Sequence, residues 1–206
     1  LIQAFRNGVD VHAATAEKIF GVPHEEVTAD QRRVAKTANF GIMYGISSFG
    51  LSQRLGISRS EAKKLIDDYF NAFPAIRSFI DDTIAAAREN GYVETIFGRR
   101  RYLPDINARN ATVRALAERN AVNAPIQGTA ADIIKLAMIG VDRKMAEEGL
   151  RSKMVLQIHD ELLFDTISSE REKLMSIVKE QMEHVTELSV PLTVECNYGK
   201  NWLEAH

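Results

Sequence analysis

The chain has 206 residues, of which 45% are hydrophobic and 26% are charged, and its formal net charge is −2. This length and composition allow one or two domains with a buried core. They exclude a membrane-spanning segment, because no apolar run approaches about 18 residues, and an internal disulfide, because Cys196 is the single cysteine.

The first 150 residues are predicted to be mainly helical. Helices are expected at four places, each opened by a capping residue, a proline or an apolar periodic run: 9–20, 28–44, 58–70 and 74–90. Weak alternation at 92–95, followed by Gly98, predicts a hairpin turn. A long helix is expected over 108–149, with a break near Pro125 because proline removes a helical hydrogen bond.

The last third of the chain changes from helical to strand periodicity. Three strands are expected in it: 153–158, 162–165 and 191–196. His159, Asp160 and Glu161 are expected at the tip of a tight hairpin between the first two strands. A helix is expected at 169–187. The predicted class is α+β, a mainly helical lobe followed by a lobe with a small antiparallel sheet.

One face of the helix predicted at 28–44 carries an ordered set of side chains. Arg32, Lys36, Phe40 and Tyr44 recur every four residues, so they lie on one slowly drifting stripe about 18 Å long. Along the helix the stripe offers two cations and then two aromatic rings. A nucleoside triphosphate has the same layout, and arginine can bind phosphate oxygens in a fork. Each residue alone would fit an amphipathic helix with core aromatics, but the ordered set favours a nucleotide site.

Two further polar sets are candidates for function. The hairpin tip presents Asp160 and Glu161 on rigid strands, which suits a hard cation such as Mg²⁺, although an exposed polar turn would look the same. Arg119, Asn123 and Gln127 again recur every four residues. Asn and Gln can donate and accept at minor-groove base edges, where all Watson–Crick pairs offer similarly placed acceptors. A solvated polar helix face is the alternative.

Charge is unevenly distributed along the chain. Residues 1–120 carry 17 Lys and Arg against 14 Asp and Glu, whereas residues 121–206 carry 9 against 14. Six arginines fall within 97–119: Arg99, Arg100, Arg101, Arg109, Arg114 and Arg119. Such a strip can bind phosphates beside a carboxylate site that holds metal, and a solvated charged loop is the alternative.

The segment 32–45 matches every fixed position of R-x-x-x-K-x-x-x-F-G-x-x-Y-G and resembles the O-helix motif of family A DNA polymerases. The resemblance implies template-directed DNA synthesis, in which a nucleotidyl group passes from a deoxynucleoside triphosphate (dNTP) to a primer 3′-hydroxyl. It implies that Arg32 and Lys36 hold the triphosphate. It places Phe40 on the nucleotide sugar and base, and Tyr44 near the templating base.

The resemblance extends along the chain. His12, in the string V-D-V-H, resembles a family histidine that also touches the triphosphate. The string Q-I-H-D-E at 157–161 resembles palm motif C, which implies that Asp160 binds metal, that Glu161 lies beside the site and that His159 contacts the primer end. Three residues are thereby assigned to catalysis: Asp160, Lys36 and Glu161.

The string N-A-P-I-Q-G-T-A-A-D at 123–132 resembles the family helix that follows the primer–template minor groove. Four residues are thereby assigned to DNA binding: Arg119, Asn123, Gln127 and His159. The resemblance divides the chain into a fingers subdomain at 1–107 and the C-terminal part of a palm subdomain at 108–206.

The implied cofactor is Mg²⁺ in a two-metal site, and the implied partners are primer–template DNA and dNTPs. The protein is expected to be a monomer in the bacterial cytoplasm, associated with the nucleoid and not with a membrane. The family's motif A, an Asp-Tyr-Ser-like segment, does not occur in the sequence. The chain also begins without Met, so it is expected to be a piece of a longer polymerase and inactive alone.

Three other functions remain open at this point. A single-subunit phage-type RNA polymerase has a similar helix and His-Asp turn, but Phe40 and Glu161 favour DNA synthesis. A metal phosphohydrolase could use His12, His24, His159 and Asp160, but it needs its His-Asp pair on a helix. A non-catalytic nucleic-acid-binding module is the third alternative.

Overall fold

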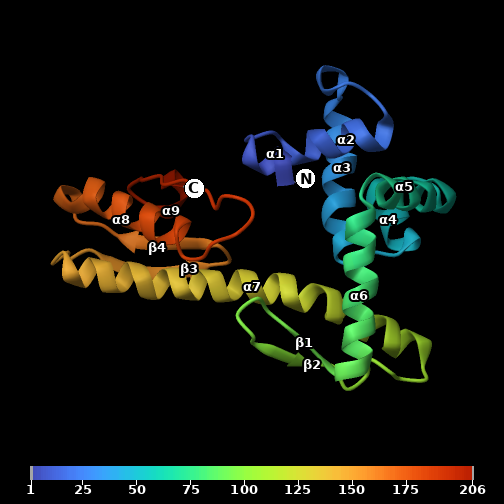
Figure 1. Cartoon of the computed structure of the whole chain (residues 1–206). Helices are drawn as coiled ribbons and strands as arrows, with labels where there is room; N and C mark the ends of the chain where they lie inside the picture. Colours follow the sequence, from blue (N-terminus) through green and yellow to red (C-terminus); the bar gives the residue numbers. More distant parts are fainter. Residues whose placement is uncertain (1, 206) are drawn as a thin grey trace. The chain divides into compact units, whose positions relative to one another are not determined.

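The computed structural model describes residues 2–205, which divide into two compact units, one ending at Gly128 and the other starting at Thr129. Helices dominate, and the described strands form two small antiparallel sheets, which confirms the α+β class (Figure 1). The boundary at 107/108 between fingers and palm stays a prediction. Within residues 2–205, no helix combines the length and apolar character that crossing a bilayer requires.

The first unit is built mainly from helices. Up to residue 90 they are α1 (Ile2–Arg6), α2 (Val11–Phe20), the 3₁₀ helix η1 (His24–Glu26), α3 (Ala29–Met43), α4 (Ser48–Leu55), α5 (Arg59–Ala72) and α6 (Pro74–Asn90). The four helices predicted in this region are confirmed as α2, α3, α5 and α6. Helix α4 was not predicted, although Ser47 caps it by accepting a hydrogen bond from the Gly50 N–H at 3.1 Å.

Local sequence sets the two ends of α3. Thr28 and Gln31 form a capping box: the Gln31 N–H donates to Thr28 Oγ1 at 3.2 Å, and the Thr28 N–H donates to Gln31 Oε1 at 2.9 Å. At the other end Gly45 has a φ of +71°, a left-handed conformation that glycine adopts without steric cost.

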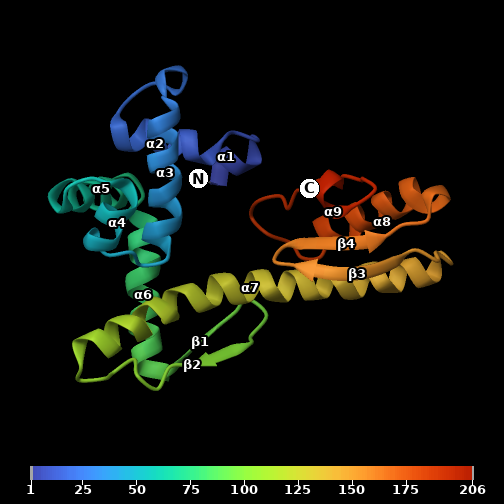
Figure 2. The same ribbon diagram turned by 180° about the vertical axis from the view of Figure 1, so that it is seen from behind.

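The inner face of α3 packs against its helical neighbours. Ala38 and Ile42 share a buried cluster with Tyr69 and Phe73, and both views show α2, α4 and α5 around α3 (Figure 2). Burial of the Tyr69 ring raises the pKa of its hydroxyl to about 12. The apolar half of α3 is thereby anchored, and its other half is left exposed.

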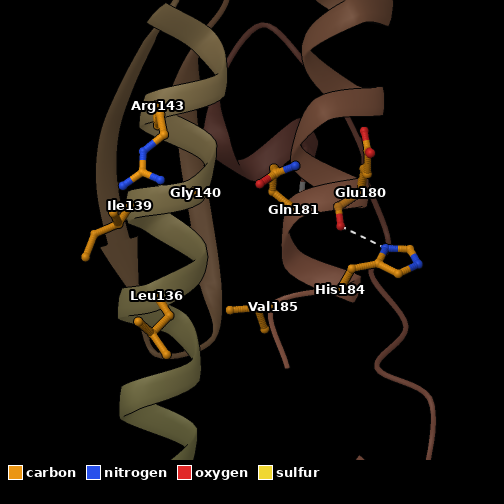
Figure 3. Close-up of a pocket in the computed structure, with 8 residues that line it drawn as sticks. All are labelled: Leu136, Ile139, Gly140, Arg143, Glu180, Gln181, His184 and Val185. Carbon is orange, nitrogen blue, oxygen red and sulfur yellow. Dashed lines mark hydrogen bonds between the residues drawn. The ribbon is translucent and has the colours of Figure 1, made fainter. Parts of the chain in front are cut away.

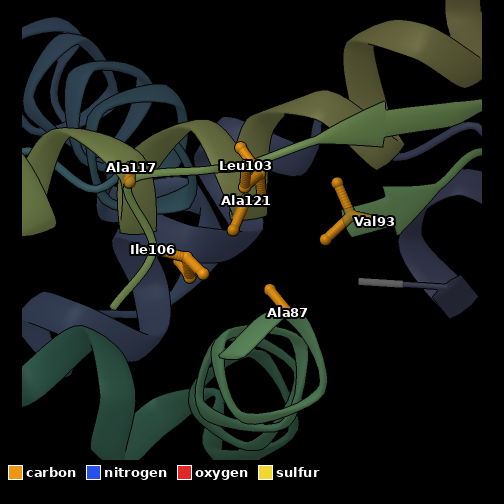
Figure 4. Close-up of a cluster of buried hydrophobic side chains, with 6 residues drawn as sticks. All are labelled: Ala87, Val93, Leu103, Ile106, Ala117 and Ala121. Carbon is orange, nitrogen blue, oxygen red and sulfur yellow. The ribbon is translucent and has the colours of Figure 1, made fainter. Parts of the chain in front are cut away.

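The hairpin β1 (Tyr92–Glu94) and β2 (Arg100–Tyr102) follows, in the place predicted for it. It packs with α6 and the start of α7 (Ala111–Glu147) around a core of small and branched side chains: Ala87, Val93, Leu103, Ile106, Ala117 and Ala121 (Figure 4). The predicted break near Pro125 is wrong, because α7 is continuous. Pro125 has no N–H to donate to the Ala121 carbonyl, so α7 lacks one helical hydrogen bond there. Ala121 is fully buried, and its packing holds the helix together at this point.

The second unit combines the rest of α7 with β3 (Lys153–Ile158), β4 (Glu161–Asp165), the 3₁₀ helix η2 (Ser168–Glu170), α8 (Arg171–Glu183) and α9 (Trp202–Ala205). In its core Val141 and Met145 of α7 share a buried cluster with Leu174 and Val178 of α8. Met154 of β3 and Phe164 of β4 pack against this cluster. The predicted hairpin is confirmed, but Glu161 is the first residue of β4, paired with Ile158, and not part of the turn.

The predicted strand at 191–196 is wrong. Among residues 2–205 no strand is paired with this segment, and a strand needs a neighbouring ladder to satisfy its backbone groups. The Val194 N–H donates instead to the Glu183 carboxylate at 3.0 Å. The predicted helix at 169–187 is present but shorter, as α8.

Candidate functional site

The outward face of α3 carries the predicted stripe. Arg32, Lys36 and Phe40 are exposed, and Tyr44, which follows the last helical residue, is half-buried. Phe40 is 50% exposed, although a large aromatic ring gains free energy by burial. The stripe is therefore a surface available to a ligand, and its aromatic ring is not a core residue of this unit.

Asp10 connects α2 to the start of the stripe. Its Oδ1 accepts hydrogen bonds from the His12 N–H at 2.9 Å and the Ala13 N–H at 3.2 Å, which caps α2. Its Oδ2 accepts a hydrogen bond from Arg32 Nε at 2.5 Å. The bond from Arg32 is the largest cause that lowers the pKa of the Asp10 carboxyl, so Arg32 is paired with an anion when no ligand is bound.

His12 lies beside the middle of the stripe. Its ring centroid is 5.7 Å from that of Phe40, with the two rings tilted by 52°. Burial lowers the pKa of His12, and the cations Arg32 and Lys36 lower it further, whereas Asp10 opposes them. The structure thus brings His12 together with three of the four stripe residues, around one exposed patch.

The sequence reasoning missed two residues of this site, Asp10 and Asn39. Asn39 is 7% exposed, and its Nδ2 lies 3.1 Å from Nδ1 of His12 and 3.0 Å from Oγ1 of Thr15. A signal was present, because Asn39 falls in the buried stripe of Ala35, Ala38 and Ile42. A polar residue at such a position needs a buried hydrogen-bonding partner.

The polar residues Arg119, Asn123 and Gln127 lie on α7, and the first of them lies next to the end of α3. A Cβ atom on Gly45 would lie 2.9 Å from Cγ of Arg119, so the chain after α3 and the Arg119 stem are in close contact. Arg119 and Gln127 are exposed, whereas Asn123 is half-buried and its Oδ1 lacks a hydrogen-bonding partner in the described part of the chain. The three residues remain candidates for contact with a nucleic acid.

The basic strip divides into structural and exposed arginines. Arg99 donates to the Gly128 carbonyl at 3.0 Å, Arg100 pairs with Glu94 at 2.6 Å, and Arg114 donates to the Ala108 carbonyl at 2.9 Å. The side chains of the other three are exposed and form no ion pair within residues 2–205: Arg101, Arg109 and Arg119. Half of the strip therefore supports the fold and half is available to phosphates.

In the second unit, His159 and Asp160 of the β3–β4 turn and Glu161 at the start of β4 are exposed. His159 has a φ of +53°, a conformation that is uncommon outside glycine, and its carbonyl accepts a hydrogen bond from Gln157 Nε2 at 2.6 Å. Because His159 and Asp160 lie on a hairpin and not on a helix, the site does not resemble the phosphohydrolase alternative.

The donor chemistry at this turn fits a hard cation only in part. Mg²⁺ binds through one or two carboxylates and completes its shell with water and substrate phosphates, and Asp160 can supply one such carboxylate. In the part of the chain that the structure describes, no cluster of three or more His, Cys, Asp or Glu side chains could hold a metal. A complete protein cage is therefore not built from these residues.

Two cavities lie elsewhere. One of about 470 Å³ lies between α7 and α8 and is lined by residues that include Leu136, Ile139, Arg143, Gln181 and His184 (Figure 3). Another of about 310 Å³ is lined by residues of α6, β1 and Pro125. No predicted site residue lines either of these two cavities.

The chain matches known proteins over its whole length. A model of the family described as DNA polymerase family A matches residues 1–204. The chain is 52% identical over 206 residues to DNA polymerase I of Streptococcus pneumoniae, covering 100% of this chain and 24% of that protein. It is 50% identical over 205 residues to DNA polymerase I of Geobacillus stearothermophilus, covering 100% and 23%. The chain therefore spans about a quarter of the length of these relatives.

A solved structure agrees with these matches. The chain superposes on the POL domain of Pol1 from M. smegmatis, in complex with DNA primer-template and dNTP, with a TM-score of 0.95 and 47% identity. The match covers 100% of this chain and 36% of that chain.

Proposed function

This chain belongs to DNA polymerase family A, and we propose on that basis that it provides the dNTP-binding surface and one metal-binding carboxylate for template-directed DNA synthesis. The observation that carries the proposal is the patch formed by the exposed Arg32, Lys36 and Phe40 and the half-buried His12. The family match favours DNA synthesis over the RNA-polymerase alternative.

Each residue of the patch has a chemical role in this proposal. Arg32 binds phosphate oxygens in a fork, and Lys36 adds a point charge. Both stabilise the negative charge that develops on the departing pyrophosphate while the primer 3′-hydroxyl attacks the α-phosphorus. Phe40 lies against the sugar of the bound dNTP, and Tyr44 lies near the templating base.

The family implies dependence on divalent metal ions in general. We propose Mg²⁺, with Asp160 as a ligand and Glu161 beside the site. When bound, the metal would lower the pKa of the attacking hydroxyl and neutralise phosphate charge. Asp160 is suited to hold it because the turn between β3 and β4 leaves the carboxylate exposed.

The proposed partners are primer–template DNA and dNTPs. Arg119, Asn123 and Gln127 would follow the minor groove, and His159 would contact the primer end. The exposed Arg101 and Arg109 would add contacts to phosphates, so DNA binding should weaken steeply with salt. The bacterial cytoplasm is the proposed compartment, which suits the single cysteine.

A chimera tests the proposal. This chain would replace the matching quarter of the pneumococcal DNA polymerase I, and primer extension would be measured with Mg²⁺ and four dNTPs. We expect template-directed extension, which Asp160→Ala abolishes. Lys36→Ala should lower kcat/KM for dNTP roughly 100-fold or more without changing DNA affinity.

The matched control is Lys63→Ala, which removes an exposed lysine from α5. A folded chimera that fails to extend the primer would count against the proposal. Equal losses from Lys36→Ala and Lys63→Ala would also count against it.

A further inference from the structure

Asn39 and Thr15 form a buried hydrogen-bond network behind the exposed patch. Thr15 is fully buried, and its Oγ1 lies 2.8 Å from the Val11 carbonyl, to which it can donate its proton. The hydroxyl can then accept from Asn39, whose Nδ2 lies 3.0 Å away and whose Oδ1 lies 3.2 Å away. One amide proton of Asn39 is thereby used, and the other is left for a second acceptor.

That second acceptor is the His12 ring. Nδ1 of His12 lies 3.1 Å from Nδ2 of Asn39, and a nitrogen that accepts a hydrogen bond carries no proton. In a neutral imidazole the proton then sits on Nε2, because the bond made by one ring nitrogen decides the state of the other. Within the described residues no hydrogen bond involves Nε2 of His12, and Nε2 is not among the buried unpartnered atoms.

We propose that Asn39 is a positioning residue that acts through His12: it donates to Nδ1, keeps the ring proton on Nε2, and so makes Nε2–H the donor offered to a bound triphosphate. This inference rests on the proposed function, in which the triphosphate lies along Arg32 and Lys36. A neutral donor is favoured here because burial lowers the pKa of His12 and the charges of Arg32 and Lys36 lower it further, against the opposing charge of Asp10.

Burial isolates this network from water. Asn39 is 7% exposed and Thr15 is 0% exposed, so the amide cannot exchange its partners for water without opening the contact between α2 and α3. Phe40 follows Asn39 directly and lies against the His12 ring. Asn39, on the inner face of α3, therefore decides which ring nitrogen of His12 carries the proton that is offered at the outer face.

The test measures the His12 tautomer by ¹⁵N NMR in the 206-residue chain, with and without inorganic tripolyphosphate. We expect an unprotonated Nδ1 and a protonated Nε2, with Nε2 shifting when tripolyphosphate binds. Asn39→Asp replaces the donor with an acceptor and should move the proton to Nδ1. Asn39→Leu should give a mixture of tautomers and a roughly three- to tenfold weaker affinity for tripolyphosphate, the loss of one hydrogen bond to a charged group.

Ser52→Ala is the matched control, because it removes another buried hydroxyl of the same unit, 6% exposed and donating to the Phe49 carbonyl at 2.8 Å. It should leave the His12 tautomer unchanged. A protonated Nδ1 in the unsubstituted chain would overturn the proposal, as would an unchanged tautomer in Asn39→Asp. If instead Lys36→Ala left tripolyphosphate binding intact, the proposed function would fail while the tautomer result stood.

Discussion

Asp10 Oδ2 accepts a hydrogen bond from Arg32 Nε at 2.5 Å, while the other oxygen of the same carboxylate caps α2. The residue that resembles a triphosphate-binding arginine is therefore already paired with an anion. A triphosphate must share Arg32 with Asp10 or displace it.

Asp10→Asn should strengthen tripolyphosphate binding. Asparagine keeps an oxygen that can cap α2, but it removes the charge that competes with phosphate for Arg32. Because the pair is partly exposed, the expected gain is only roughly two- to fivefold in Kd, measured by isothermal titration calorimetry. The control is Asp30→Asn, which removes an exposed partner of Arg33 and should have no effect. Weaker binding in Asp10→Asn would mean that Asp10 orients Arg32 instead of competing for it.

Gly45→Ala should destabilise the first unit more than Gly56→Ala. Both glycines have left-handed φ values, +71° and +67°, so both substitutions carry a backbone cost of about 1–2 kcal/mol. Only at Gly45 would the new Cβ lie 2.9 Å from Arg119 Cγ, whereas nothing lies within 4 Å at Gly56. Urea denaturation should show the larger loss for Gly45→Ala. Equal losses would show that the Arg119 stem moves aside freely.

Glu170→Gln should reduce stability at neutral pH and flatten its dependence on pH. The Glu170 carboxylate accepts hydrogen bonds from Ser152 Oγ at 2.7 Å, from the Ser152 N–H at 2.8 Å and from the Arg151 N–H at 3.0 Å. These bonds, led by the Ser152 hydroxyl, lower the pKa of Glu170. Between the folded-state and the unfolded-state pKa of Glu170, the unfolded chain binds a proton that the folded chain does not. The stability that Glu170 contributes is therefore present above the unfolded-state pKa and is lost as the pH falls through the folded-state pKa.

The prediction for Glu170 is checked by measuring the midpoint of urea denaturation at a series of pH values, from neutral pH to below the ordinary pKa of a glutamate side chain. Glu172→Gln is the matched control, because the side chain of Glu172 is 81% exposed and pairs with its neighbour Arg171. If both variants lost stability in parallel as pH fell, Glu170 would not be the group responsible.

Phe40→Tyr should relax discrimination against dideoxynucleotides in the chimera. Phe40 is 50% exposed on the proposed nucleotide-binding face, so an added hydroxyl would point into the site without disturbing a core. By resemblance to the family, that hydroxyl stands in for the missing sugar 3′-hydroxyl. Competition between dideoxy and deoxy substrates gives the ratio, and an unchanged ratio would place Phe40 away from the sugar.

The sequence by itself determined the helix that carries the stripe and the hairpin that carries Asp160. Both depend on local physics: the period of the helix, the Thr28–Gln31 capping box, the left-handed Gly45 and the alternation of short strands. The positions of Arg32, Lys36, Phe40 and Tyr44 on one face follow from spacing alone, so they could be predicted before any tertiary contact was known.

Only the tertiary structure decided which residues complete the patch. It also decided where the secondary structure departs from the prediction made from local sequence. Asp10 and Asn39 reach Arg32 and His12 across 22 and 27 residues of chain, distances over which local spacing predicts no contact. Packing around Ala121 keeps α7 continuous through Pro125, and residues 191–196 lack a paired strand in the described part of the chain. The physical reason is the same in each case: burial and long-range hydrogen bonds outweigh a local preference of about 1–3 kcal/mol.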